Sequence, residues 1–221
     1  MNQSEKINIK DIFLPPNLAS LARILITPFV GYFLWLGTEK ATLICVILLA
    51  IAALTDFLDG FLARRLNQIT RLGLILDPLA DKILTIVLII ELIFFRNFPL
   101  WLAILILARD IVIMILASGV IKKHDSVPAS NLTGKYYFGS IAFLLISYVM
   151  NFKFGIMLFL YIVIILMLLS SINYGRIFWR IKNGQEIAAF KDKTIYKTGR
   201  ILLSVVIIGL YLYRLYLDNP F

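Results

Sequence analysis

Seven apolar stretches, each long enough to cross a lipid bilayer, constrain the fold of this 221-residue chain most strongly. A helix that crosses a hydrocarbon core of about 30 Å needs about 20 apolar residues. The stretches fall at 18–37, 41–62, 74–95, 99–121, 136–152, 155–179 and 200–217. Hydrophobic residues make up 61% of the chain and charged residues 16%, against about 45–50% and about 25% in soluble proteins. The sequence therefore predicts an all-α polytopic membrane helix bundle and excludes a water-soluble globule.

We expect one membrane domain across residues 1–221, because the chain contains no fixed-period repeat and no long linker. Its parts are a juxtamembrane segment at 1–17, a core at 18–182, and a cytoplasmic linker with an extra apolar segment at 183–221. Residues 7–14 predict a short interfacial helix that ends at two prolines. The last apolar stretch, 200–217, is the least secure span, because it is short and contains Arg214. Pro78 is tolerable if it lies in the first turn of a helix.

The basic residues are distributed unevenly over the connections between these stretches. One set of alternate connections contains fifteen Lys or Arg residues, and the other set contains four. Three more lie inside spans or at their edges. Cytoplasmic loops of membrane proteins are enriched in Lys and Arg, so the amino terminus is predicted inside and the carboxyl terminus outside. This pattern accounts for the net charge of +9, and we expect no nucleic-acid partner. The predicted location is a plasma membrane of the bacterial inner-membrane type.

Six of the thirteen acidic residues lie within the apolar stretches. They are Asp56, Asp59, Asp77, Asp81, Glu91 and Asp110. A carboxylate costs about 2.5–3.5 kcal/mol at the bilayer centre, so such residues usually have a function. Glu91 stands near the outer end of its stretch and could snorkel to the interface, and Asp110 can form a local charge pair with Arg109. For Glu91 we favour a structural role, whereas for Asp110 a local charge pair or cap is at least as well supported as a chemical role.

The other four carboxylates approach one cytoplasmic connection from both sides. Asp56 and Asp59 are three residues apart and Asp77 and Asp81 are four apart, so each pair lies on one helical face. An antiparallel helix pair can turn these faces toward each other. Four ionised carboxylates in a low dielectric need protons or metal ions between them. An all-oxygen site suits a hard cation, which we predict to be Mg²⁺ or Mn²⁺.

The residues between the acids indicate a phosphorylated ligand. Gly60 and Ala63 lie on the same side as the carboxylates, where a ligand could approach the backbone, although close helix packing would also explain either residue. Arg64 can bind a phosphate with two hydrogen bonds or anchor the helix at the inner surface.

This stretch resembles the CDP-alcohol phosphotransferase family, whose signature is D-x2-D-G-x2-A-R-x8-G-x3-D-x3-D. Every fixed position is matched, by Asp56, Asp59, Gly60, Ala63, Arg64, Gly73, Asp77 and Asp81. The resemblance implies six core transmembrane helices around a cytoplasm-facing cavity, and homodimers. The family transfers a phosphatidyl or similar group from a CDP-linked lipid to an alcohol. The seventh apolar segment departs from this pattern.

The resemblance also implies residue roles. Two metal ions would be held by Asp56, Asp59, Asp77 and Asp81, and Asp81 would be the general base. The CDP moiety would be bound by Asp59, Gly60, Ala63, Arg64 and Gly73.

The sequence identifies the acceptor alcohol less clearly than it identifies the transfer reaction. The residues 72–82 and the opening Pro16-Asn17-Leu18 to Arg23 resemble the phosphatidylglycerophosphate synthases, which combine CDP-diacylglycerol with glycerol 3-phosphate. The resemblance places Arg109, Lys135 and Arg176 at the acceptor, and ordinary inner-surface anchoring is the alternative for all three. The run Ala108-Arg109-Asp110 also resembles the cardiolipin-synthase branch, whose acceptor is phosphatidylglycerol. Inositol phosphate and serine are two further candidates for the acceptor.

Two other classes of protein use carboxylates in membranes. An ion transporter needs polar groups that continue to the far side of the membrane, and the outer halves of these spans offer little beyond Glu91. A membrane prenyltransferase also binds diphosphate through Mg²⁺, but its acidic motifs usually lie on widely separated helices of a longer chain. The CDP-alcohol phosphotransferase interpretation is preferred to both.

Overall fold

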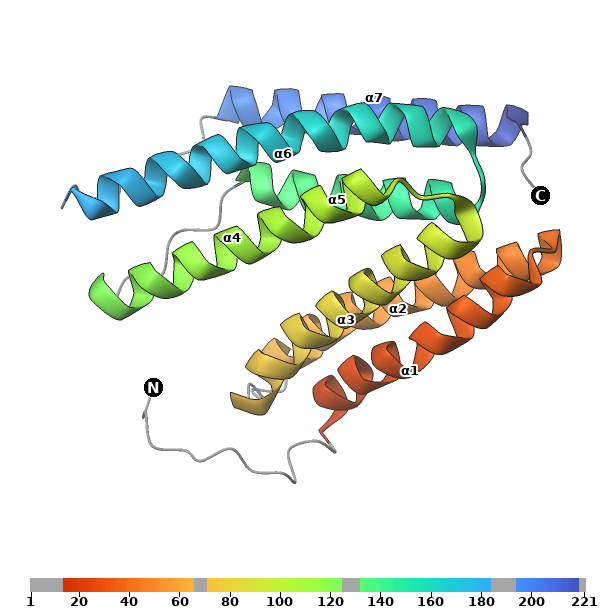
Figure 1. The fold of residues 1–221 in the computed structure, drawn as a ribbon, viewed down its shortest axis with the longest axis horizontal. Helices are drawn as coiled ribbons and strands as arrows, with labels where there is room; N and C mark the ends of the chain where they lie inside the picture. Colours follow the sequence, from red (N-terminus) through yellow and green to blue (C-terminus); the bar gives the residue numbers. More distant parts are fainter. Residues whose placement is uncertain (1–13, 66–70, 125–131, 184–193, 219–221) are drawn as a thin grey trace. The chain divides into compact units, whose positions relative to one another are not determined.

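The computed structural model describes residues 14–65, 71–124, 132–183 and 194–218. Every regular element in these ranges is an α-helix (Figure 1). The helices are α1 (Pro15–Leu36), α2 (Glu39–Arg65), α3 (Arg71–Arg96), α4 (Leu100–His124), α5 (Leu132–Val149), α6 (Lys153–Lys182) and α7 (Thr194–Asp218). Each predicted apolar stretch corresponds to one helix, which confirms the all-α fold class. Residues 7–13 of the predicted interfacial helix lie outside the described residues.

The first helix begins and ends at residues suited to these positions. Pro15 and Pro16 occupy its first positions, where a missing N–H costs nothing because the first N–H groups of a helix have no intrahelical partner. Gly37 ends it with φ 63°, a left-handed conformation that glycine adopts without strain, and its N–H donates to the Phe33 carbonyl at 3.4 Å. Asn97 and Asn151, in the short connections after α3 and α5, also have φ of 53°.

Two prolines lie in helix interiors. Pro28 lies inside α1, and Pro78 lies well beyond the first turn of α3, which begins at Arg71. The first-turn position at which the sequence analysis expected Pro78 to be tolerable is therefore not the position that it occupies. A proline inside a helix removes one backbone hydrogen bond, and membrane helices accept this where neighbouring groups satisfy the freed carbonyl.

The chain divides at Phe98 and Pro99 into two compact units. In the first unit, α1 packs against both α2 and α3. Its core includes Val30, Leu34, Cys45 and Leu92, all of them 0–1% exposed. The thiol of Cys45 donates to the Val30 carbonyl at 3.4 Å, which ties α2 to α1. The prediction of a single membrane domain stays a prediction.

Glu91 of α3 belongs to this packing. Its side chain is half-buried against Gly31 of α1, where a Cβ atom would clash with the carboxyl group. Its Oε2 atom is buried and has no hydrogen-bond partner within the described ranges. Glu91 therefore points at α1 and packs against it instead of snorkelling to the interface.

In the second unit, α5 and α6 form the main helix pair, and α4 and α7 each contact α6. The core residues of the pair include Leu144 and Val163, which are fully buried. α7 presents a narrow inward stripe at Arg200, Ser204, Ile207, Tyr211 and Leu215, and Tyr211 is the buried member. The remaining described side chains of α7 are exposed, as expected of a helix that faces lipid on most sides.

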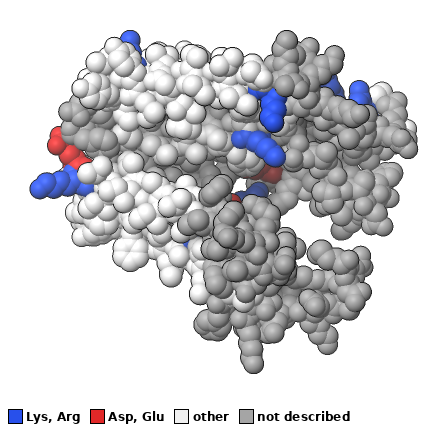
Figure 2. All heavy atoms as spheres, turned by 180° about the vertical axis from the view of Figure 1, so that it is seen from behind, with Lys and Arg blue, Asp and Glu red and all other residues white. Residues whose placement is uncertain are grey.

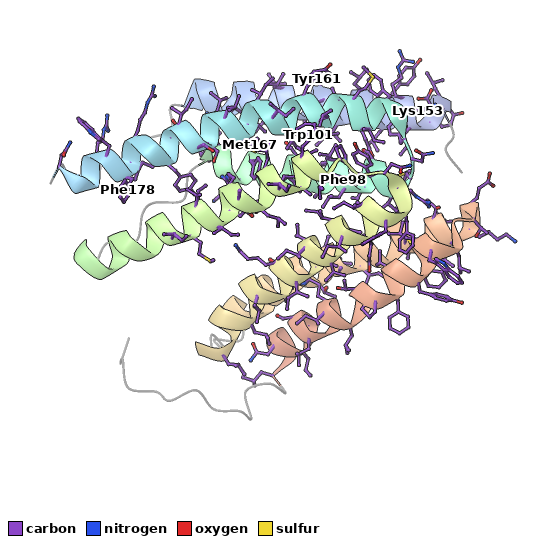
Figure 3. The ribbon with its side chains drawn as sticks, in the orientation of Figure 1. Phe98, Trp101, Lys153, Tyr161, Met167 and Phe178 are labelled. Carbon is purple, nitrogen blue, oxygen red and sulfur yellow. The ribbon has the colours of Figure 1, made fainter. Side chains whose placement is uncertain are left out.

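Large apolar side chains cover the described surface. Trp101 of α4 and Tyr161 of α6, both labelled in Figure 3, are 51% and 62% exposed. On the face seen in Figure 2, charged residues occupy only a few isolated places on the described surface. Exposed apolar area of this extent is not sustained in water. These features identify an integral membrane protein.

Three segments of the described chain are long and apolar enough to span a membrane by length and composition. They are Asn17–Leu36, Lys153–Arg180 and Lys197–Asp218. The segment Lys197–Asp218 contains the stretch 200–217, which was the least secure of the predicted spans. The count of seven spans and the predicted orientation stay predictions.

Candidate active site

The end of α2 and the start of α3 carry the four predicted metal ligands. Asp59 and Asp77 each lie six positions from the helix end next to the connection 66–70, which is about 9 Å along the axis. Asp56 and Asp81 lie deeper, about 13–15 Å from the same ends. Asp59 and Asp77 therefore lie at equal distances from their own helix ends, and Asp56 and Asp81 at nearly equal distances.

The side chains of most signature residues fall outside the described part of the structure. These are Asp56, Asp59, Gly60, Ala63, Arg64 and Asp77, whose backbones lie in α2 and α3. The predicted convergence of the carboxylates and their contacts with a nucleotide therefore stay predictions. Gly73, the predicted CDP contact at the start of α3, is described and is buried.

Asp81 is the predicted metal ligand whose side chain the structure describes. It is 51% exposed and forms an ion pair with Arg23 of α1 through its Oδ1 atom. Arg23 itself is only 1% exposed. A half-exposed carboxylate is a suitable hard oxygen ligand for Mg²⁺ or Mn²⁺, so Asp81, the described member of the predicted donor set, fits the predicted metal.

Arg23 belongs to a line of buried polar residues on α1. Asn17, Ser20 and Thr27 lie on the same side of the helix and are likewise almost fully buried. The hydroxyl of Thr27 donates to the Arg23 carbonyl at 3.1 Å. Sequence reasoning placed Arg23 inside a span without a site role, although it is the one charged residue of α1, which was a usable signal.

Arg109 of α4 is buried among polar and aromatic partners. Its Nη1 atom donates to Asp110 Oδ1 at 2.8 Å, and its Nη2 atom donates to Ser170 Oγ at 2.6 Å. The guanidinium lies 4.3 Å from the ring centre of Tyr137. The predicted Arg109–Asp110 charge pair is therefore confirmed. Because the side chain is 7% exposed, Arg109 is not an anchor in the lipid head groups.

One buried polar atom of Arg109 and one of the neighbouring Tyr137 have unused hydrogen-bonding capacity. The Nε atom of Arg109 and the hydroxyl of Tyr137 have no hydrogen-bond partner in the part of the chain that the structure describes. Buried polar groups are nearly always paired, by protein, water or ligand. Both atoms can therefore bind an oxygen of a ligand or of a water molecule.

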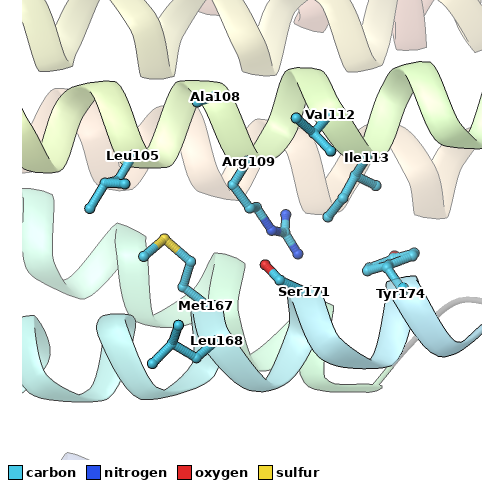
Figure 4. A pocket seen from close by; sticks show the side chains of 10 residues that line it. Leu105, Ala108, Arg109, Val112, Ile113, Met167, Leu168, Ser171 and Tyr174 are labelled. Atoms are coloured by element: carbon cyan, nitrogen blue, oxygen red, sulfur yellow. The ribbon is translucent and has the colours of Figure 1, made fainter.

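A cavity of about 330 Å³ adjoins Arg109 between α4 and α6 (Figure 4). Figure 4 shows the guanidinium reaching from α4 toward α6, close to the hydroxyl of Ser171. Most of the lining is apolar, and Tyr174 contributes an aromatic ring. The apolar lining residues include Leu105, Val112, Ile113, Met167 and Leu168. This cavity can hold an alkyl group beside a polar end.

The other two predicted acceptor residues have a different environment. Lys135 at the start of α5 and Arg176 near the end of α6 are both exposed. Neither forms an ion pair with a described residue, and neither lines the cavity beside Arg109. Their predicted role in acceptor binding stays a prediction.

Sequence reasoning missed Tyr137, Ser170 and Ser171 beside Arg109. The two adjacent serines interrupt an apolar run in α6, and this was an available signal. Nothing in the sequence indicated that Tyr137 of α5 would stack on an arginine of α4.

The fold and this site define an integral membrane protein of the helix-bundle class, with acidic residues at one end of two helices and a buried arginine in each unit. The family model described as CDP-alcohol phosphatidyltransferase matches residues 13–179, well over half of the chain. The chain belongs to this family. The match ends within α6, so α7 lies outside the matched residues.

Curated relatives of two kinds resemble the chain. A CDP-diacylglycerol--glycerol-3-phosphate 3-phosphatidyltransferase of Aquifex aeolicus is 43% identical over 124 residues, which cover 55% of this chain and 67% of the relative. A cardiolipin synthase (CMP-forming) of Streptomyces coelicolor is 33% identical over 140 residues, covering 60% and 63%. The human cardiolipin synthase (CMP-forming) is 37% identical over 123 residues, covering 55% and 39%. The chain therefore spans about two thirds or less of the length of these relatives.

Proposed function

We propose that this protein transfers a phosphatidyl group from CDP-diacylglycerol to an alcohol and releases CMP, with glycerol 3-phosphate as the acceptor. The observation that carries the proposal is the complete signature of eight residues on α2 and α3, inside the region that the family model matches. The name of the Aquifex relative supports the acceptor. The product would be phosphatidylglycerophosphate, a phospholipid precursor.

In this proposal the four aspartates bind two Mg²⁺ ions, or Mn²⁺ in their place. Their similar distances from the adjoining ends of α2 and α3 support this arrangement. The ions, when bound, would neutralise the diphosphate of the donor and polarise the phosphorus under attack. Asp59, Gly60, Ala63, Arg64 and Gly73 would bind the CDP moiety.

The transfer then needs one base and no covalent enzyme intermediate. The acceptor hydroxyl attacks the phosphorus that carries the diacylglycerol, and the bond from this phosphorus to the bridging oxygen breaks. CMP leaves with the bridging oxygen. Asp81 takes the hydroxyl proton as attack proceeds, a role for which its half-exposed carboxylate is accessible.

A phosphorylated acceptor needs a cation beside it, and Arg109 supplies one. The unused Nε atom of Arg109 and the hydroxyl of Tyr137 can donate hydrogen bonds to phosphate oxygens. Lys135 and Arg176 would add charge from the exposed ends of α5 and α6. Asp110 and Ser170 hold the guanidinium in place for this role.

One observation favours a second acceptor. The cavity beside Arg109 is lined mostly by apolar side chains, which suit a lipid chain better than a small phosphorylated alcohol. Phosphatidylglycerol as acceptor would give cardiolipin, which is the product named for the Streptomyces relative. Both candidates share the donor, the metal and the carboxylates.

The proposal places the site on the cytoplasmic side of a bacterial-type plasma membrane. The excess of Lys and Arg in one set of connections supports this orientation. We also propose that two chains form a homodimer. Chemical crosslinking in native membranes, followed by electrophoresis, would detect the dimer and would give only monomers if this part is wrong.

The acceptor is tested with purified protein, CDP-diacylglycerol and Mg²⁺. Glycerol 3-phosphate, phosphatidylglycerol, inositol phosphate and serine are offered in separate reactions, and CMP and the new lipid are measured. We expect glycerol 3-phosphate to give the fastest CMP release and phosphatidylglycerophosphate. Faster release with phosphatidylglycerol would establish the second candidate, and no release with any alcohol would refute the proposed function.

A further inference from the structure

Arg23 contacts the proposed general base from a helix that carries no signature residue. It reaches from α1 to Asp81 of α3, and these two helices are packed against each other. Burying a guanidinium inside a membrane protein is costly unless a counter-charge compensates for it. The ion pair with Asp81 supplies this compensation.

The ion pair also fixes the direction of the carboxylate. A carboxylate has two oxygens in one plane, and binding Oδ1 to a buried guanidinium determines where Oδ2 points. A general base must lie within hydrogen-bond reach of the proton that it removes, so its orientation affects the rate directly. Arg23 cannot turn freely, because it is enclosed by the packed helices.

The positive charge of Arg23 is a second reason to connect this residue with Asp81. The four aspartates contribute four negative charges at the ends of α2 and α3, and they would repel one another before a metal ion arrives. Arg23 places a permanent positive charge on one of them from the protein side. It therefore reduces this repulsion and leaves the half-exposed side of Asp81 available to ligands.

We propose that Arg23 is a positioning residue for the transfer: its buried guanidinium orients Asp81 and partly neutralises the carboxylate cluster. This inference rests on the proposed function. Arg23 itself would contact neither substrate, so its loss should affect the chemical step more than the binding of the donor. Because Arg23 competes with metal ions for Asp81, its loss should not weaken metal binding.

The test compares Arg23→Met, Arg23→Lys and a matched control, Thr27→Val. Thr27 is buried on the same face of α1 one turn away, and its hydroxyl donates to the Arg23 carbonyl. For each purified variant we would measure kcat, the KM for CDP-diacylglycerol, and Mn²⁺ affinity by electron paramagnetic resonance.

We expect Arg23→Met to lower kcat about tenfold to a hundredfold, since a misplaced catalytic group can cost this much. The KM for the donor should change less than about threefold, and Mn²⁺ should bind as tightly as in the wild type or more tightly. Arg23→Lys should recover part of kcat, and Thr27→Val should retain it. A kcat within about threefold of the wild type, or losses of Mn²⁺ affinity and kcat of equal size, would overturn the inference.

A second measurement covers the case in which Arg23→Met unfolds. The double variant Arg23→Met with Asp81→Asn removes both charges, so its thermal unfolding temperature should return toward that of the wild type. A double variant no more stable than Arg23→Met would contradict the ion pair. Failure of the proposed function is distinguishable, because wild-type protein would then release no CMP while this stability coupling would persist.

Discussion

Replacing Tyr211 by alanine should detach α7 from the rest of its unit. Tyr211 is 3% exposed and is the buried hydrophobic residue of the described part of α7. Its ring centre lies 5.5 Å from that of Phe143 and 5.3 Å from those of Phe152 and Phe159. Its hydroxyl lies 3.2 Å from the hydroxyl of Ser147. One side chain therefore joins α7 to α5, to α6 and to the connection between them.

The magnitude follows from these contacts. Each edge-to-face aromatic pair is worth about 0.5–1.5 kcal/mol, so three pairs give about 1.5–4.5 kcal/mol. A hydrogen bond between membrane helices adds about 0.6 kcal/mol. No hydrophobic transfer term is added, because lipid tails are as apolar as the protein interior. Tyr211→Ala should weaken the docking of α7 by about 2–5 kcal/mol, and Tyr211→Phe by about 0.6 kcal/mol.

The assay is reversible unfolding by sodium dodecyl sulfate in mixed micelles, with protease access to the connection 184–193 as a local probe. Tyr213→Ala is the matched control, because Tyr213 is on the same helix and is 59% exposed. We expect this control to leave both measurements close to the wild type. Equal destabilisation by Tyr213→Ala and Tyr211→Ala, or by Tyr211→Phe and Tyr211→Ala, would refute this account of α7 docking.

Three further predictions concern other parts of the molecule. Gly155→Ala should destabilise the fold by about 1–3 kcal/mol, because a Cβ there would lie 2.5–2.7 Å from neighbouring side-chain atoms; Gly139→Ala meets nothing within 4 Å and should be neutral or stabilising in thermal unfolding. Arg109→Lys should lower kcat/KM for the acceptor at least about tenfold, because lysine lacks the planar fork that binds Asp110 and Ser170 together; an unchanged value would remove Arg109 from the acceptor site. Removal of divalent ions with EDTA should abolish CMP release and Mg²⁺ should restore it, whereas full turnover in EDTA would exclude the metal.

The helices could be predicted well because an apolar stretch in a membrane has few alternatives to a helix. The stretch 18–37 corresponds to Pro15–Leu36, and the boundary at Gly37 is a recognisable helix end. The longest helix, Lys153–Lys182, extends beyond the predicted 155–179 at both ends, because polar residues can continue a helix outside the hydrocarbon core. Pro78 misled the prediction, since a proline inside a helix is acceptable only when tertiary contacts compensate for it.

The site was predictable only as far as local spacing reaches. The signature fixed the aspartates on α2 and α3, because three- and four-residue spacings are properties of one helix. The partners of Arg109 were not predictable, because Ser170 follows it by 61 positions and meets it only through helix packing. The pairing of Arg23 with Asp81 spans 58 positions and has the same cause. Burial of a charge by distant helices leaves little trace in a single sequence.

The central claim is that aspartates of α2 and α3 hold divalent ions for transfer from a CDP-linked lipid. Counting bound Mn²⁺ by electron paramagnetic resonance, in the presence of CDP-diacylglycerol, tests it most directly. We predict about two ions per wild-type chain, and fewer in Asp59→Asn and in Asp77→Asn, with CMP release lost in both variants. Equal Mn²⁺ binding by the wild type and both variants, with CMP release retained, would contradict the claim.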